Sequence, residues 1–485
     1  MIFRILRNIL SLLTGHVVSK LFSLVGVIVL ARWLGVEGFG TYGTVMAYLT
    51  LFAVFADGGT STVTIREVAQ DYTRSTEYFS HVLTLRGILT VGAYGLMLLL
   101  GSIWKSTDFS LLFIASCGLF LFPEAIRKLG ISMLSAYERM DLVAVLAVLS
   151  IVFRYIPFFA AILLGKSLHF AFMVLVGVWT GVAGIWLLIT KKYCLEQWRT
   201  PINFQQLRNI LYESFPFGIL LVLSVIYFKS DIIMLSKMQG KAAVGFYEGA
   251  YNFIGASMFI PTSIVSVLLP VMSRTFVTDK TSYNSVYTHS TRILAMGILP
   301  VAICVSFFSK EIILLVYDAD YLPSASALSL LIWALFFIFI NAPVGNIIAT
   351  SKRIHVLLPY AIGNTLLNIL LNFFLIPEYS FLGASFTTVF TEFISFVVQL
   401  YFANRVLGNA SQTLWMMGKA LTAGAVASIA FYLVKSSAIF PLNVLILMSV
   451  YIICLFMFKV IGREDKQLCL EIIHIAKTTL ATRMK

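Results

Sequence analysis

The chain has 485 residues, of which 59% are hydrophobic and only 12% charged, and its formal net charge is +13. A soluble domain is usually about a quarter charged, so this composition excludes a soluble globular protein. Basic loops on the cytoplasmic side of a membrane protein explain the positive charge, so we expect no nucleic-acid partner.

Long apolar runs follow one another along the whole chain. A helical crossing needs about 20 apolar residues, and runs such as LFSLVGVIVLA lack the alternation of barrel strands. We therefore predict an all-α integral membrane protein with about fourteen transmembrane helices. The expected ranges are 13–34, 39–62, 80–103, 108–132, 141–164, 168–190, 211–236, 244–272, 289–309, 324–349, 355–376, 381–403, 413–434 and 440–460.

The N-terminal segment runs directly into a full-length span and has no A-x-A cleavage site, so we expect it to be retained. An even number of spans places both termini on one side of the membrane. Most of the 35 Lys and Arg residues then fall in connections on that side, which predicts cytoplasmic termini. The five cysteines form no CxxC pair, and we expect neither a metal nor another cofactor.

The first connection, RWLGVEGFGTYG, has a weak copy in KMQGKAAVGFYEG. Laid over each other without gaps, the two windows align Gly35 with Gly240 and Gly40 with Gly245. We interpret the glycines as residues of a tight turn and the copy as a repeat of six helices. The repeat predicts an N-terminal lobe (1–200), a C-terminal lobe (201–408), and two accessory helices with a cytoplasmic tail (409–485).

Charged residues inside the spans are costly there and are functional candidates. Three basic residues are singled out: Lys20, which shares a stripe with His16 and Ser23, Arg154 near the middle of its span, and Lys229. Lys20 either faces a cavity or extends to the cytoplasmic edge, and Arg154 either lines a cavity or forms a structural ion pair. Three acidic residues are candidates for ion or proton coupling: Asp57, Asp231 and Glu392.

Three asparagines recur every four residues on the eleventh predicted span, at positions Asn364, Asn368 and Asn372. One interpretation is polar contacts between helices, and the other is a lining that meets sugar hydroxyls. The spacing leaves both interpretations open.

Several stretches, in the right order over about residues 10–405, resemble the Wzx-type polysaccharide and O-antigen repeat-unit flippases. These belong to the multidrug/oligosaccharidyl-lipid/polysaccharide exporter superfamily. The resemblance rests on ARWLGVEGFGTYG, DGGTSTVTIREVAQ, ESFPFGI, SDIIMLSKMQGKAAVGFYEGAYNF, PVMSR and GNTLLNILLNFFLIPEYSFLGASFTT. It implies a two-lobed, V-shaped transporter in a bacterial inner membrane rather than an enzyme.

The resemblance further implies a substrate, undecaprenyl-pyrophosphate carrying an oligosaccharide unit, that moves from the inner to the outer leaflet by alternating access. It also implies membrane lipids, a polysaccharide polymerase and a chain-length regulator as partners in O-antigen, lipopolysaccharide or capsule synthesis. Lys20, Arg154 and Lys229 could attract the anionic pyrophosphate in a low-dielectric cavity. Asn364, Asn368 and Asn372 could meet the sugars.

Two alternatives belong to other classes of protein. A multidrug antiporter of the same superfamily, driven by H⁺ or Na⁺, should have an acidic cavity, whereas the basic residues inside these spans favour an anion. A membrane glycan polymerase or ligase should carry a large outer loop with Arg or His chemistry, and the connections here are short.

Overall fold

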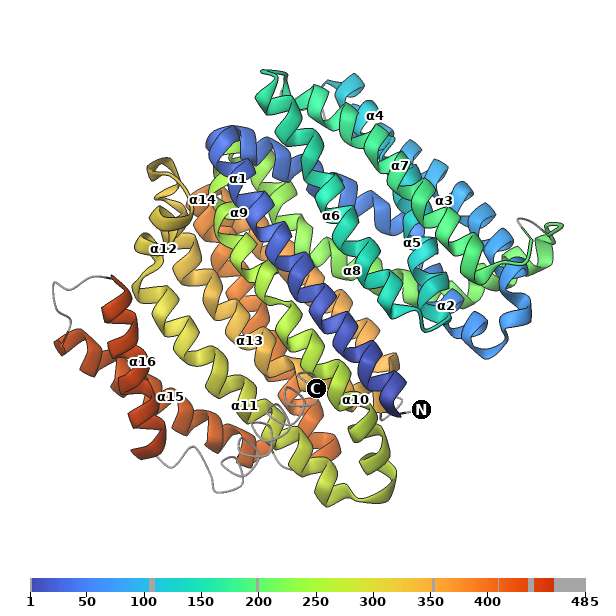
Figure 1. The fold of residues 1–485 in the computed structure, drawn as a ribbon. Coiled ribbons are helices and arrows are strands. Elements are labelled where there is room, and N and C mark those ends of the chain that lie inside the picture. The colour runs from blue at the N-terminus through green and yellow to red at the C-terminus, as the bar shows by residue number, and fades with distance from the viewer. Residues whose placement is uncertain are drawn as a thin grey trace, which may run out of the picture. The chain divides into compact units, whose positions relative to one another are not determined.

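The computed structural model describes residues 2–103, 110–197, 200–350, 354–408, 410–434 and 440–457. Within these ranges every regular secondary-structure element is a helix, which confirms the all-α prediction (Figure 1). The longer helices are α1 (Ile2–Asp57), α3 (Ser75–Ile103), α5 (Leu121–Ala136), α6 (Met140–Leu163), α7 (Leu168–Cys194), α8 (Phe204–Met238), α9 (Lys241–Ser257), α10 (Phe259–Thr278), α11 (Lys280–Phe307), α13 (Ser324–Thr350), α14 (Ile354–Leu407), α15 (Ala410–Val434) and α16 (Phe440–Met457). The shorter ones are α2 (Thr60–Gln70), η1 (Tyr72–Arg74), α4 (Leu111–Gly118), α12 (Ser309–Val316) and η2 (Ala319–Tyr321).

These helices account for the predicted number of spans. Eight segments of the described chain are long and apolar enough to cross a membrane, and two of them, Ser19–Asp57 and Leu358–Leu407, each contain a kink. The kinks divide them into two crossings apiece, and the pairs α4/α5 and α9/α10 add one crossing each. Together with α15 and α16, the total agrees with the predicted fourteen.

Both kinks need an unusual backbone conformation. Gly35 has φ 64° and ψ −179°, a region that glycine enters readily because it has no Cβ. Ser380 has φ 52°, and the backbone then packs so closely that a Cβ on Gly383 would overlap the carbonyl oxygen of Leu375. The predicted role of Gly35 in a tight turn is therefore confirmed.

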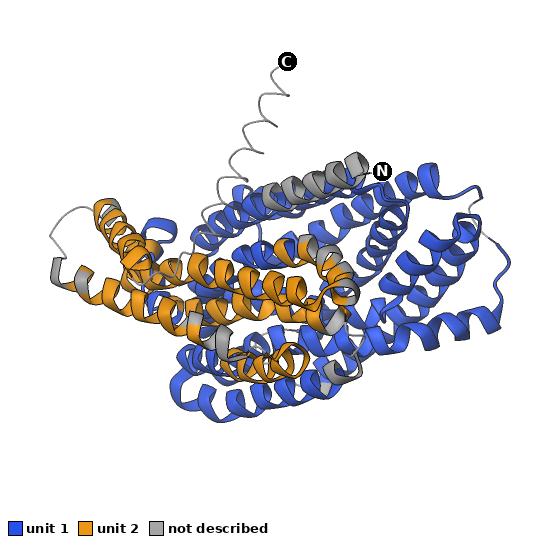
Figure 2. Ribbon diagram, turned by 90° about the horizontal axis from the view of Figure 1, so that it is seen from below, with its two compact units in different colours: residues 1–263, 313–327, 353–391 blue, residues 264–312, 328–352, 392–485 orange. Residues whose placement is uncertain are grey.

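Backbone contacts divide the described chain into two compact units (Figure 2). Unit 1 comprises residues 1–263, 313–327 and 353–391, and unit 2 comprises residues 264–312, 328–352 and 392–485. In unit 1, α1 packs against α6, α8 and α9, while α7 packs against α5 and α6. In unit 2, α11 packs against α15 and α16. The division into lobes of 1–200 and 201–408 remains a prediction from the repeat.

The two copies of the glycine window contact each other inside unit 1. A Cβ on Gly40 would overlap the carbonyl oxygen of Lys241, and a Cβ on Gly245 would overlap that of Val36. Val36 and Lys241 occupy equivalent positions in the two windows, so the contact is reciprocal. Gly40 and Gly245 therefore allow the two windows to approach closely, a role that turn chemistry alone does not give them.

Candidate functional site

A cavity of about 600 Å³ lies inside unit 1. Helices α1, α2, α5, α6, α7 and α8 contribute to its wall. This volume falls within the usual range for small-molecule sites, about 300–1,000 Å³. The polar side chains in the wall are Thr50, Asp57, Ser61, Thr62, Glu124, Arg127, Lys128, Ser132, Ser150 and Arg154.

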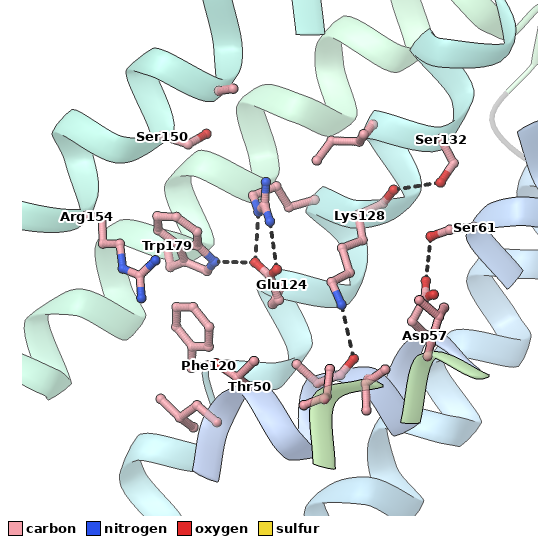
Figure 3. A pocket seen from close by; sticks show the side chains of 18 of the residues that line it. Thr50, Asp57, Ser61, Phe120, Glu124, Lys128, Ser132, Ser150, Arg154 and Trp179 are labelled. Atoms are coloured by element: carbon pink, nitrogen blue, oxygen red, sulfur yellow. Dashed lines mark hydrogen bonds and ion pairs between the residues drawn. The ribbon is translucent and has the colours of Figure 1, made fainter. Parts of the chain in front are cut away.

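Arg154, on α6, is a half-buried cation that lines this cavity (Figure 3). Its Nε is buried without a hydrogen-bond partner, and Nη2 lies 3.7 Å from the sulfur of Met46. No carboxylate of the described residues lies within 4.0 Å of its guanidinium. A planar guanidinium whose Nε is unpartnered has a donor available for an anionic oxygen.

Lys128, on α5, is a second cation of the cavity wall. Its Nζ lies 3.4 Å from the carbonyl oxygen of Ala53, and no described carboxylate lies within 4.0 Å of it. Arg154 and Lys128 lie on opposite sides of Glu124 (Figure 3). The two cations can therefore approach one ligand from two directions.

Glu124 and Arg127 neutralise each other one helical turn apart on α5. The guanidinium donates two hydrogen bonds to the carboxylate, at 2.7 and 2.8 Å. The indole Nε1 of Trp179 donates a third, at 2.9 Å, to Oε2 of Glu124. One face of Trp179 stacks on Phe120, and the guanidinium of Arg127 lies 5.6 Å from its ring centroid. The charge of Arg127 is balanced by the carboxylate of Glu124, so Arg127 adds little net charge to the cavity.

Asp57 also lines the cavity, but its charge is balanced by Arg86 from α3. The ion pair measures 2.6 Å, and Arg86 is only 1% exposed. Arg86 donates further hydrogen bonds to Thr60, Ser61 and the carbonyl oxygen of Ala125. These contacts join the end of α1 to α2, α3 and α5.

The charges in the cavity wall do not balance. Glu124 is paired with Arg127 and Asp57 with Arg86, whereas Arg154 and Lys128 have no described carboxylate within reach. Two positive charges therefore remain uncompensated in a site of low dielectric constant. Such a site attracts an anion with two or more negative charges and disfavours a cation.

A second polar cluster lies in unit 1 around Asp231 on α8, which is 2% exposed. Its carboxylate accepts hydrogen bonds from Asn372 at 2.6 Å, Tyr247 at 2.7 Å and Thr388 at 3.1 Å. All three donors are neutral. Among the described residues, no Lys or Arg nitrogen lies within 4.0 Å of this carboxylate.

The asparagine stripe contributes to this second cluster. Asn368 accepts hydrogen bonds from Ser230 and Asn372, each at 3.1 Å. Asn368 and Asn372 therefore connect α14 to α8, which is the helix contact that one of the two interpretations expects. Asn364 is half-buried, and its Oδ1 has no partner. None of the three lines the cavity of Arg154.

The remaining predicted residues lie elsewhere. Lys20 is exposed on α1 and does not line the cavity, although Ser23 on the same stripe contacts Tyr155 of α6 at 3.3 Å. The side chain of His16 lies outside the described set. Lys229 approaches Glu248 of α9 at 4.0 Å, also away from the cavity. Glu392 is 7% exposed and belongs to unit 2.

Comparison with solved structures places the fold among membrane transporters. A structure of the lipid II flippase MurJ in an inward closed conformation matches with a TM-score of 0.74 and 15% identity, covering 91% of this chain and 96% of that one. An inward-facing multidrug resistance MATE transporter of the MOP superfamily gives 0.61 and 16%, with 80% and 95% covered. A MOP superfamily transporter of Pyrococcus furiosus, reported for the reverse polarity of its binding pocket, gives 0.58 and 15%, with 84% and 96% covered.

The chain belongs to the polysaccharide biosynthesis protein family, whose model matches residues 5–276. The MatE family model matches residues 216–374. An uncharacterized membrane protein of Methanocaldococcus jannaschii is 26% identical over 206 residues, which are 41% of each chain. The capsular polysaccharide biosynthesis protein CapF of Staphylococcus aureus is 24% identical over 298 residues, 60% of this chain and 70% of that protein. The protein is a multi-pass membrane protein of this family, and its fold is that of the transporters named above.

Proposed function

We propose that this protein is a flippase that moves undecaprenyl-pyrophosphate-linked oligosaccharide units from the inner to the outer leaflet of a bacterial cytoplasmic membrane. The transported units are expected to be used for the synthesis of a surface polysaccharide, either O-antigen or capsule. The observation that carries the proposal is the pair of uncompensated cations, Arg154 and Lys128, in a cavity lined by hydroxyl groups. A pyrophosphate supplies the multiple negative charge that this cavity favours.

The cavity would hold the headgroup while the prenyl chain stays in the lipid. Arg154 would bind phosphate oxygens through its planar fork, and Lys128 would add a compact charge from the opposite side. Thr50, Ser61 and Ser132 would offer hydroxyl groups to the first sugar. The similarity to CapF supports a role in capsule-type synthesis.

Transport in proteoliposomes tests this function. We expect the purified protein to expose a lipid-linked oligosaccharide to a membrane-impermeant glycosidase added outside. Lys128→Ala should lower the rate about tenfold, which corresponds to the loss of about 1.4 kcal/mol from one charge-assisted contact. Lys128→Arg should keep most of the activity. Lys166→Ala, an exposed lysine outside the cavity, is the matched control and should behave like the parent.

The competing function is export of cationic drugs by ion-driven antiport. The MatE match and the MATE-like fold are compatible with this function. Gradient-driven ethidium transport by the same vesicles, without movement of the lipid-linked oligosaccharide, would favour the antiporter and contradict the flippase.

We further propose Asp231 as the coupling group among the three acidic candidates. Asp57 forms an ion pair with Arg86, whereas the carboxylate of Asp231 accepts hydrogen bonds from neutral donors only. A buried carboxylate that no cation contacts directly gains stability by taking up a proton or a small cation. Its donors come from α9 and α14, so a change in its charge would alter the packing of three helices.

Asp231→Asn should make transport insensitive to imposed pH or Na⁺ gradients, and the gradient-driven rate should fall at least tenfold. Thermal stability should fall only modestly, because the amide oxygen still accepts the hydrogen bonds from Tyr247 and Thr388, whereas the amide nitrogen cannot accept the one from Asn372. The measurement is the transport rate in vesicles with and without each gradient. A variant that responds to both gradients like the parent would exclude Asp231 as the coupling group.

A further inference from the structure

The segment that connects α7 to α8 is bound to α3 by two hydrogen bonds. The backbone N–H of Thr200 donates to Oγ of Ser80 at 3.1 Å, and the backbone N–H of Asn203 donates to Nε2 of His81 at 2.9 Å. Ser80 and His81 are adjacent on α3 and are 3% and 1% exposed. Asn203 is the N-cap residue of α8, so these bonds fix the place where that helix begins. We call the two bonds the linker contact.

The linker contact requires a neutral imidazole at His81. A backbone N–H can only donate, so the Nε2 that accepts from Asn203 carries no proton. Nδ1 lies 2.7 Å from the carbonyl oxygen of Glu77, which can only accept, so the single ring proton is on Nδ1. One neutral tautomer therefore satisfies both contacts. A second proton, on Nε2, would place two donors opposite each other and break the bond to Asn203.

A polar pocket of about 180 Å³ borders His81. It is separate from the Arg154 cavity, and α2, η1, α3 and α8 contribute to its wall. Asn209 and Glu213 in this wall are exposed, so water and protons can enter the pocket. The charged or titratable side chains that line it, besides His81, are Glu67, Arg74, Glu77, Tyr78 and Glu213.

The charges around this pocket favour the protonated form of the histidine. Arg74 pairs with Glu77, and Arg66 pairs with both Glu67 and Glu213. Among these side chains, three carboxylates therefore face two guanidinium groups, and one negative charge remains. A charged imidazole would balance it. The neutral ring has a partner in the backbone and the charged ring has partners in the pocket, and histidine changes its charge between about pH 5 and pH 8.

We propose that His81 is a pH-sensitive switch that releases the linker contact when the cytoplasm becomes acidic. The predicted topology places this pocket at the cytoplasmic surface. The neutral ring maintains the contact at higher pH, and the contact is lost as the pH falls and the ring takes up a proton. Because α8 contributes to the Arg154 cavity and carries Asp231, loss of its fixed start should slow transport. This last step rests on the proposed transport function, whereas the switch itself does not.

Amide hydrogen exchange tests the switch without any substrate. The measured quantity is the protection of the Thr200 and Asn203 amides at about pH 7.5 and about pH 5.5, corrected for the pH dependence of intrinsic exchange. We expect this protection to fall at least tenfold at the lower pH in the parent protein. His81→Gln keeps an acceptor near the position of Nε2 but cannot take up a proton, so its protection should be the same at both pH values.

Two further variants complete this experiment. His81→Ala removes the acceptor, so protection should be low at both pH values. His169→Gln is the matched control, because His169 lies on α7 outside the pocket and contacts Ser116, and it should keep the parental pH response. A pH response that persists in His81→Gln, or a parent protein whose protection does not depend on pH, would overturn the proposal.

A disulfide tests the effect on transport with His81 intact, in case a histidine variant does not fold. Ser80→Cys and Thr200→Cys lie at the linker contact, and their oxidation ties the connection to α3 at any pH. With the same pH on both sides of the vesicles, the reduced protein should transport the oligosaccharide at least threefold more slowly at about pH 5.5 than at about pH 7.5. The oxidised protein should lose most of this difference.

The outcomes separate the switch from the transport function. Equal pH dependence of transport in the oxidised and reduced proteins would overturn the control of transport by the linker contact. The expected exchange results, without oligosaccharide transport at either pH, would support the switch and contradict the proposed substrate.

Discussion

Arg154→Ala should reduce export of the lipid-linked oligosaccharide at least about thirtyfold while the protein still inserts in the membrane. Removing one desolvated charge from a charge-assisted contact typically costs about 2–5 kcal/mol, and the lower value corresponds to about thirtyfold. Because Arg154 has no carboxylate partner among the described residues, its removal leaves no buried anion behind. The loss should therefore appear in transport rather than in stability.

Arg154→Lys tests whether transport needs only the positive charge at this position or also the planar guanidinium. Lysine keeps the positive charge but offers no planar fork, so we expect partial activity. The measurements are surface glycan in a deletion strain and the vesicle assay, with the amount of membrane-inserted protein determined in parallel. Arg208→Ala, at an exposed arginine outside the cavity, is the control. Normal glycan display by Arg154→Ala would remove Arg154 from the mechanism.

Arg154 was predictable because an arginine in the middle of a long apolar run is costly unless it faces a cavity or a partner. Lys128 was not predictable in the same way. The predicted span ends near 132, which puts Lys128 close to its cytoplasmic end, whereas α5 continues to Ala136. Hydropathy does not distinguish a lysine that extends to the membrane surface from one that lines a cavity near that surface.

Arg86 was missed although its sequence carries a usable signal. It lies in HVLTLRGILTV, inside a predicted span, and a charge at such a position indicates a buried partner. The partner itself could not be found from sequence, because Asp57 belongs to a different helix and no local spacing connects the two. The same limitation applies to Asp231, whose donors come from α9 and α14.

The glycine windows show which structural features an internal repeat can predict. Counting spans and aligning Gly35 with Gly240 was enough to predict a turn, and both residues have positive φ, 64° and 85°. The alignment also pairs Gly40 with Gly245. It did not indicate that each glycine meets the backbone of the other window, because contact between repeats depends on how the helices pack in space.

Breaking the buried Asp57–Arg86 ion pair should strongly destabilise the protein. Removing one partner of a buried pair leaves an uncompensated charge and costs about 3–5 kcal/mol. We expect Asp57→Asn and Arg86→Met each to lower the midpoint of thermal unfolding in detergent by many degrees. The double variant Asp57→Leu/Arg86→Met should recover much of the loss, because a pair of apolar side chains leaves no charge to be compensated.

The same variants decide between two roles for Asp57. If Asp57 is structural, as its pairing with Arg86 indicates, the double variant that regains stability should still respond to ion gradients. If Asp57 is instead the coupling group, Asp57→Asn should keep its stability and lose the gradient response, which would contradict the assignment to Asp231. Stability and gradient response therefore have to be measured on the same preparations, because only their combination separates a helix-joining ion pair from a residue that exchanges its charge during transport.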